Sequence, residues 1–166
     1  MEIKMSKKLW VTPYRCIGCR SCEIACSFVH SKSPMAPAVT RVRAYTFTAT
    51  TSSVNLCLQC DDAACQKVCP TTALPRNSAT GAIEVDMNKC VLCMMCTVAC
   101  PFGNIHFDKG QKEIVKCDVC EGDPACAKFC PTRALEWSEN PSPDLAPGTQ
   151  IEVPPLPLMA RLGNVA

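Results

Sequence analysis

The chain has 166 residues, of which 48% are apolar by a count that includes 16 cysteines, 5% are aromatic and 19% are charged. This length fits one domain or two small lobes, and a formal net charge of +2 without any basic run gives no support for nucleic-acid binding. No segment approaches about 18 consecutive apolar residues, so no membrane-spanning helix is expected. Residues 1–10 contain lysines without an apolar stretch behind them, which predicts a cytoplasmic protein without a secretory signal.

The cysteines fall into four groups of four, and none is left over. In chain order the groups are Cys16, Cys19, Cys22 and Cys26; Cys57, Cys60, Cys65 and Cys69; Cys90, Cys93, Cys96 and Cys100; and Cys117, Cys120, Cys126 and Cys130. The third group reads C-x2-C-x2-C-x3-C followed by Pro101, a spacing typical of bacterial proteins in which three thiolates hold one iron–sulfur cluster and the fourth holds another. The four groups therefore predict four [4Fe–4S] clusters held by all 16 cysteines, in a protein that conducts electrons.

The segments around the cysteines predict short elements of both kinds, and hence an α+β fold. The last half of each group is expected to form a short helix, over residues 23–29, 63–68, 94–99 and 125–129. Residues 39–50 are rich in β-branched and aromatic side chains and are expected to form an edge strand. Strand pairs are expected between 74–76 and 82–85, and between 105–107 and 113–115. Lys109, Lys112 and Lys116 are interpreted as a solvated face of the second pair, with docking as the alternative.

The segment after Trp137 differs from the rest of the chain. Residues 138–166 contain six of the 14 prolines and no cysteine, which divides the sequence into a cluster domain, 1–137, and an extended C-terminal arm, 138–166. The arm is either a disordered tail or a strap that docks onto a partner subunit or onto another copy of this chain. The apolar stretch 151–159 favours docking, because an extended proline-rich segment loses little entropy when it binds.

Three other uses of the cysteines, and a ligand role for the histidines, are less consistent with the pattern. Zinc usually takes two separated C-x2-C pairs, and disulfides are rare in a reducing compartment. A three-iron cluster at one degraded site is a further alternative. His30 and His106 are not expected to be ligands, since the cysteines already form complete groups.

Ile17, Val91, Leu92 and Met94 are interpreted as packing around the clusters. With four clusters loaded the net charge becomes about −6, and the thin ordinary core predicts an unfolded apo-protein.

The segments 16–26, 57–71, 90–103 and 116–132 carry a resemblance to a known family. Across roughly residues 10–137 the chain resembles the four-cluster ferredoxin-like electron-transfer subunits that accompany molybdenum or tungsten oxidoreductases, carbon monoxide dehydrogenases and some hydrogenases. The resemblance implies two ferredoxin-like lobes, in which group one pairs with group four and group two with group three. It also implies four ligand sets, called quartets here. The first is Cys16, Cys19, Cys22 and Cys130; the second is Cys57, Cys60, Cys65 and Cys100; the third is Cys90, Cys93, Cys96 and Cys69; the fourth is Cys117, Cys120, Cys126 and Cys26.

Two groups depart from the simple spacing. Group two has four residues between Cys60 and Cys65, and group four has five between Cys120 and Cys126. Loops of this length occur in the family, so the resemblance still implies four clusters. We expect the two loops to differ in solvent exposure and in amide donors to sulfur, and therefore in the reduction potentials of their clusters.

The sequence contains no catalytic constellation, so we expect substrate chemistry to belong to another subunit. The motifs at 57–62 and 122–126 look most like the subunit that accompanies tungsten aldehyde oxidoreductases. That resemblance implies a tungsten or molybdenum pterin partner, with electrons from aldehyde oxidation passing through this chain to a flavin subunit. The alternatives are the equivalent subunit of a formate dehydrogenase, hydrogenase or carbon monoxide dehydrogenase, a free polyferredoxin carrier, and an iron–sulfur sensor.

Overall fold

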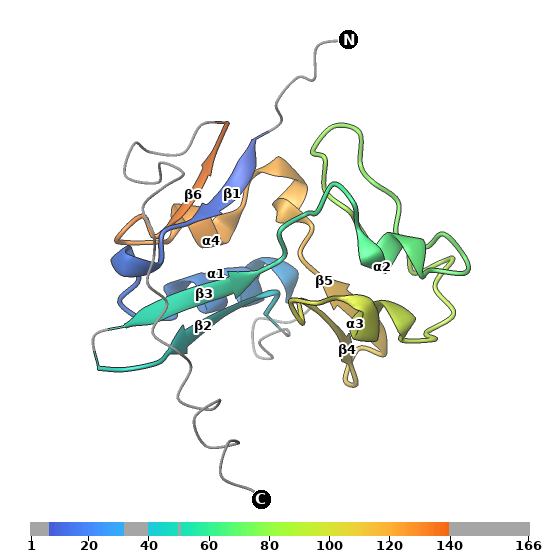
Figure 1. Cartoon of the computed structure of the whole chain (residues 1–166), viewed down its shortest axis with the longest axis horizontal. Helices are drawn as coiled ribbons and strands as arrows, with labels where there is room; N and C mark the ends of the chain where they lie inside the picture. The colour runs from blue at the N-terminus through green and yellow to red at the C-terminus, as the bar shows by residue number, and fades with distance from the viewer. Residues whose placement is uncertain (1–6, 32–39, 50, 140–166) are drawn as a thin grey trace, which may run out of the picture.

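Three short antiparallel strand pairs carry the β-structure of this chain (Figure 1). The computed structural model describes residues 7–31, 40–49 and 51–139. The pairs are β1 (Lys8–Val11) with β6 (Leu135–Ser138), β2 (Val42–Thr46) with β3 (Ser52–Leu56), and β4 (Ile105–Asp108) with β5 (Glu113–Lys116). This small α+β architecture agrees with the predicted fold class.

The helices are short, and each overlaps the last half of a cysteine group, as predicted. They are α1 (Ser21–His30), α2 (Ala64–Lys67), α3 (Met95–Ala99) and α4 (Ala125–Lys128), with single 3-10 turns at η1 (Pro13–Arg15) and η2 (Val119–Gly122). In α1 the buried residues Cys22, Ala25 and Cys26 recur at spacings of three and four, so one stripe of the helix faces inward. None of the helices in the described ranges has the length and apolar character needed to cross a membrane.

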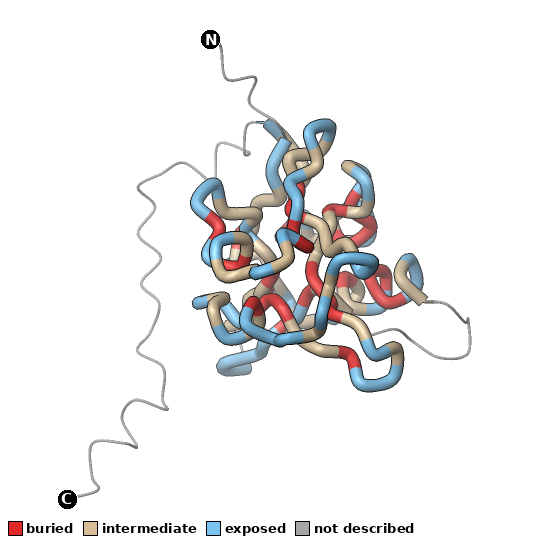
Figure 2. The backbone as a smooth tube through the Cα atoms, turned by 90° about the vertical axis from the view of Figure 1, so that its right-hand side faces the viewer, coloured by how far each residue is buried: buried red, intermediate tan, exposed pale blue. Residues whose placement is uncertain are grey.

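Two hydrophobic cores organise these elements into two lobes. In the first lobe, α1 packs against α4 and β2, and α4 also packs against β6 (Figure 1). In the second lobe, α2 packs against α3, and α3 packs against β4. The buried parts of the chain, shown in red in Figure 2, are short segments separated by exposed loops. Each core is therefore small, and cysteine side chains form a substantial part of both.

The strand predictions differ in outcome. The hairpin of β4 and β5 is confirmed, with Ile105 opposite Lys116. The predicted edge strand over 39–50 is present as β2, but its partner β3 was not predicted. The segments 74–76 and 82–85 do lie side by side, with Arg76 opposite Ile83 and the amide of Glu84 donating to the Pro75 carbonyl at 3.0 Å, but they form no regular strands, and Pro75 has no amide proton to donate to a ladder. The pairing of β1 with β6, which joins the two ends of the described chain, was not predicted either.

Two further expectations concern the hairpin lysines and the C-terminal arm. Lys109 and Lys112 are exposed as expected, but the interpretation of Lys116 as solvated was wrong, since this residue is only 3% exposed. Its position at the end of β5, directly before Cys117, carries it inward with the cluster loop. β6 extends to Ser138, and residues 140–166, which make up nearly all of the expected arm, lie outside the described residues.

Candidate cluster-binding sites

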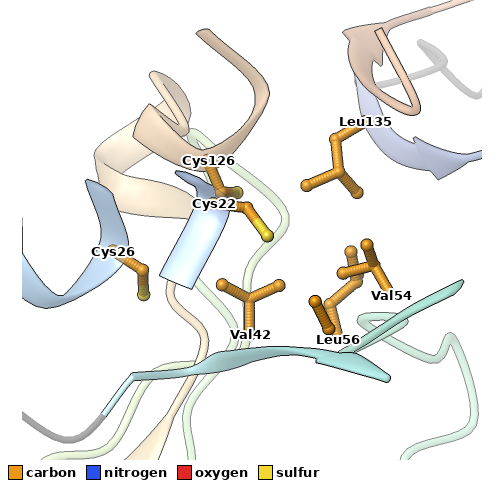
Figure 3. Close-up of a cluster of buried hydrophobic side chains, with 8 residues drawn as sticks. Cys22, Cys26, Val42, Val54, Leu56, Cys126 and Leu135 are labelled. Carbon is orange, nitrogen blue, oxygen red and sulfur yellow. The ribbon is translucent and has the colours of Figure 1, made fainter. Parts of the chain in front are cut away.

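The cysteine side chains of groups one and four meet in the first core. Cys22 and Cys26 project from α1 and Cys126 from α4, toward the β2–β3 hairpin and Leu135 of β6 (Figure 3). Cys16 and Cys130 pack against the same core from its edge. The structure thus brings together cysteines that are separated by about 100 residues in the sequence.

The cysteine side chains of groups two and three meet in the second core. Its buried members include Cys65 of α2 and Cys96 of α3. The partly buried cysteines packed against it are Cys60, Cys69, Cys90 and Cys100. The described cysteines of groups two and three thus share one core, as those of groups one and four share the other.

Two of the quartets each line one small cavity. All four cysteines of the first quartet line a cavity together with Ala44, Val54 and Leu135. All four cysteines of the third quartet line another, together with Leu74 and Val85. In each case one cysteine comes from the partner group, so the cavity forms only when the two groups have packed together. Four thiols around an apolar cavity are a suitable ligand set for a thiolate-bound metal cluster.

Electrostatic coupling between thiols indicates which other sulfurs are neighbours. Cys57 and Cys100 both act on Cys65, and Cys117, Cys26 and Cys120, together with Cys22 of the first quartet, act on Cys126. Coupling of this kind requires the sulfurs to lie near one another in a poorly solvated space.

The spacing of the sulfurs distinguishes between two kinds of metal site. Within the described part of the chain, no three cysteine thiols lie within 4.8 Å of one another. Around a single zinc ion, with Zn–S bonds of about 2.3 Å, tetrahedral geometry would place the sulfurs roughly 3.8 Å apart. Three or more of these thiols are therefore not as close together as the ligands of one zinc ion would be.

Burial determines the protonation of several thiols. It raises the pKa of Cys22 to about 11 and that of Cys117 to about 12, and it raises the pKa of Cys65, Cys96 and Cys126 as well. Such thiols stay protonated at neutral pH unless a cation replaces the proton, and metal coordination deprotonates a thiol outright. These buried sulfurs would therefore each lose a proton on binding a metal.

The loops between cysteines share an uncommon backbone conformation. In group one, Gly18 and Arg20 on either side of Cys19 have φ of 66° and 60°, and in group three, Leu92 and Met94 on either side of Cys93 have φ of 56° and 60°. Positive φ is uncommon for residues other than glycine, and it clusters at functional sites. Alternation between right- and left-handed conformations turns successive amides toward one concavity, which is a recurrent way to hold iron–sulfur clusters.

The same conformation recurs after the last cysteine of three groups. The third residue after that cysteine has positive φ in each case, and these residues are Thr72, Gly103 and Arg133. The Cys-Pro pair that precedes each of these turns is visible in the sequence, and it is the signal from which the turn could have been predicted.

Backbone amides and hydroxyls contact several sulfurs. The amide of Ala73 donates to Cys69 Sγ at 3.3 Å, and the amide of Arg41 donates to Cys26 Sγ at 3.3 Å. The hydroxyl oxygens of Thr71 and Thr132 lie 3.7 and 3.8 Å from Cys69 Sγ and Cys130 Sγ. Donors of this kind stabilise negative charge on a cluster sulfur and so affect its potential.

A polar group of three side chains borders Cys120. His30 Nε2 lies 3.7 Å from Cys120 Sγ and 3.6 Å from Asp118 Oδ1, and Arg41 forms an ion pair with Asp118. Burial, with the Arg41 charge, lowers the pKa of His30, so its imidazole is neutral at pH 7. His30 thus contacts the cysteine sulfur, whereas His106 lies on β4 in the second lobe.

The apolar residues beside the ligating loops are less enclosed than expected. Leu92 packs against the second core, but Ile17 and Val91 are more than 60% exposed and Met94 is 40% exposed. Each of these exposed side chains lies in a loop between two cysteines, where a short loop wrapped around a cavity has no second layer of chain above it.

The chain is similar to known iron–sulfur domains and electron-transfer proteins. Residues 48–140 match the family model of the 4Fe-4S dicluster domain, and residues 13–29 match that of a 4Fe-4S binding domain. The chain is 35% identical over 132 residues to the aliphatic sulfonate oxidoreductase, polyferredoxin-like subunit of Pyrococcus furiosus, covering 78% of this chain and 76% of that protein. It is 38% identical over 133 residues to the putative electron transport protein YsaA of Escherichia coli, covering 74% and 83%. It is 33% identical over 162 residues to formate hydrogenlyase subunit 2 of the same organism, covering 75% and 78%.

Proposed function

Because this chain belongs to the 4Fe-4S dicluster family of ferredoxin-like electron-transfer subunits, we propose that it holds four [4Fe–4S] clusters, one in each quartet. Each cluster, when bound, accepts and donates one electron at a time. Support for the four sets comes from the division of the cysteines between two cores and from the two cavities lined by complete quartets. No three of the described cysteine thiols lie as close together as the ligands of one zinc ion would, which supports clusters over zinc.

Three structural relations support a single series of quartets. Cys96 lies on α3 and Cys100 directly follows it, so the second and third quartets share this helix. Gln59, between Cys57 and Cys60, donates to the Cys117 carbonyl at 2.8 Å, which brings the second quartet beside the fourth. Cys22 and Cys26 both lie on α1, which brings the first quartet beside the fourth. These relations support the order third, second, fourth, first.

This order assigns the two ends of the series. The first quartet belongs to the first lobe and the third quartet to the second lobe, and each includes one exposed cysteine, Cys19 and Cys93. Exposed cysteines at the two ends suit contacts with a donor on one side and an acceptor on the other.

The partner is an oxidoreductase of which this chain is the electron-transfer subunit. Substrate chemistry belongs to that partner, and the tungsten or molybdenum aldehyde oxidoreductase remains our first candidate, with a flavin subunit as the acceptor. The similarity to a sulfonate oxidoreductase subunit supports a role beside a catalytic subunit. The similarity to formate hydrogenlyase subunit 2 favours a second candidate, a formate- or hydrogen-linked complex.

Anaerobic isolation of the native complex tests both parts of the proposal. We expect about 16 iron atoms per chain, together with a larger partner subunit that contains tungsten or molybdenum. Iron near eight per chain would contradict four clusters. A partner identified by mass spectrometry as a hydrogenase or formate dehydrogenase would select the second candidate, and full iron without any partner would select a free carrier.

A further inference from the structure

Lys116 is an uncommon residue to find buried. Lysine is almost never fully buried without compensating partners, because the ammonium loses its hydration. Lys116 ends β5, directly before the first cysteine of group four, and is 3% exposed. For comparison, the side chains of Lys67 and Lys128, which also lie within two residues of a cysteine, are 66% and 58% exposed and form ion pairs with aspartates.

The donors of the Lys116 ammonium are satisfied by oxygens that carry no formal charge. Nζ donates to the backbone carbonyl of Ile83 at 2.7 Å, to Gln59 Oε1 at 3.0 Å and to the backbone carbonyl of Cys117 at 3.1 Å. An ammonium has three protons to donate, so these bonds account for all of them. They hold the group in place and compensate for lost hydration while leaving its positive charge uncancelled.

Gln59 ties this ammonium to the loops of two different quartets. It lies between Cys57 and Cys60, its Oε1 accepts from Lys116 and from the amide of Ile83 at 2.9 Å, and its Nε2 donates to the carbonyl of Cys117 at 2.8 Å. The network therefore bridges a loop of the second quartet and the first cysteine of the fourth.

The ammonium lies beside cysteines of two quartets. Lys116 directly precedes Cys117 and donates to its carbonyl, and it also donates to Gln59, which lies between Cys57 and Cys60. Cys57 and Cys60 belong to the second quartet and Cys117 to the fourth. These two quartets are neighbours at the middle of the series, where an electron passes from one lobe to the other.

We propose that the positive charge of Lys116, which Gln59 holds in place, raises the reduction potentials of the two clusters at the junction of the lobes. This inference rests on the proposed function. Reduction adds one electron, and so one negative charge, to each cluster, and a fixed positive charge in a poorly solvated region stabilises that charge. The charge acts mainly on the second and fourth quartets. The first and third quartets lie farther from it, at the two ends of the series.

Redox titration of the full-length, anaerobically prepared holoprotein tests the inference. The variant Lys116→Met removes the charge and keeps an unbranched chain of similar length, and Lys67→Met is the matched control beside the same quartet. We expect two of the four potentials to fall in Lys116→Met, each by at least a tenfold change in the reduction equilibrium, which is about 59 mV for one electron. We expect no comparable fall in Lys67→Met, because its ion-paired charge is exposed and screened.

A second variant covers the case in which Lys116→Met fails to retain its clusters. Gln59→Glu keeps the shape and the oxygen that accepts from Lys116, but it adds a negative charge beside the ammonium, so the same two potentials should fall. Lys116→Arg, which retains the charge, should restore most of the difference seen in Lys116→Met. Unchanged potentials in fully loaded Lys116→Met or Gln59→Glu would overturn the inference. A wild-type protein with far fewer than about 16 iron atoms would instead overturn the proposed function.

Discussion

Gly18 lies in the cluster loop of group one, directly against the β2–β3 hairpin, and the substitution Gly18→Ala should destabilise the first lobe. A Cβ atom at this position would lie 2.8 Å from both Ser52 Oγ and Thr46 Oγ1. These two hydroxyls are hydrogen-bonded to each other at 3.3 Å, and Ser52 is buried. Gly18 also has φ of +66°, a conformation that alanine adopts with strain.

Two separate costs follow from this geometry. The left-handed backbone costs alanine about 1–2 kcal/mol. The contact with the hydroxyls adds about 1–3 kcal/mol, as for other overpacked sites, because Thr46 is β-branched and has few alternative rotamers. Gly18→Ala should therefore lower the free energy of unfolding by about 2–5 kcal/mol in total.

Gly103 supplies a matched control. It has φ of +63°, and a Cβ atom there would meet nothing within 4 Å, so Gly103→Ala incurs only the backbone cost. The urea concentration that removes half of the cluster absorbance, measured anaerobically after a fixed incubation, should be roughly 1 M lower for Gly18→Ala than for Gly103→Ala. The double variant Gly18→Ala, Ser52→Ala should recover part of that difference. Equal midpoints for the two single variants would refute the steric part of the reasoning.

Three further outcomes follow from other contacts. Thr132→Val removes the hydroxyl 3.8 Å from Cys130 Sγ at nearly constant volume, and redox titration should show a lower potential for one cluster only; a rise would contradict the assigned donor. Asn104→Ala removes the amide that donates to the Leu56 carbonyl at 2.7 Å, and should cost about 1–3 kcal/mol in urea unfolding because a buried acceptor is left unpaired. Removal of iron by a chelator should abolish near-UV circular dichroism, since both cores are built around sulfurs; a native-like apo spectrum would contradict this.

The local elements were predictable because their signals are local. Each helix is only four to ten residues long and begins within a cysteine group, where the spacing itself requires a turn followed by a helix. The β4–β5 hairpin follows from two apolar runs separated by Asp108 and Gly110. By contrast, β3 begins with Ser52 and Ser53, which have no strand signal of their own, and forms because Val54 and Leu56 complete the first core.

The parts of the candidate sites that were not predicted depend on tertiary contacts. The assignment of cysteines to quartets came from family resemblance, since spacing alone cannot indicate which group supplies the fourth ligand. His30 and Asp118 meet across 88 residues of sequence, and nothing in either neighbourhood marks the other. Lys116 was interpreted as solvated because it follows Lys109 and Lys112 on a predicted hairpin, and only the fold shows that the last residue of that strand turns inward.

The chain topology explains why the hydrogen bonds of Lys116 and Gln59 lie between the two lobes. The second lobe is built from one continuous stretch of chain, which enters after Leu56 and leaves at Lys116, while the first lobe is built from the segments on both sides of it. Gln59 lies at the entrance and Lys116 at the exit, and the two are bonded to each other and to the Cys117 carbonyl. The two places where the chain crosses between the lobes are thus joined by the hydrogen bonds of Gln59 and Lys116, directly beside Cys60 and Cys117. A charge placed there acts on both lobes, which an equally buried charge in the middle of either core would not do.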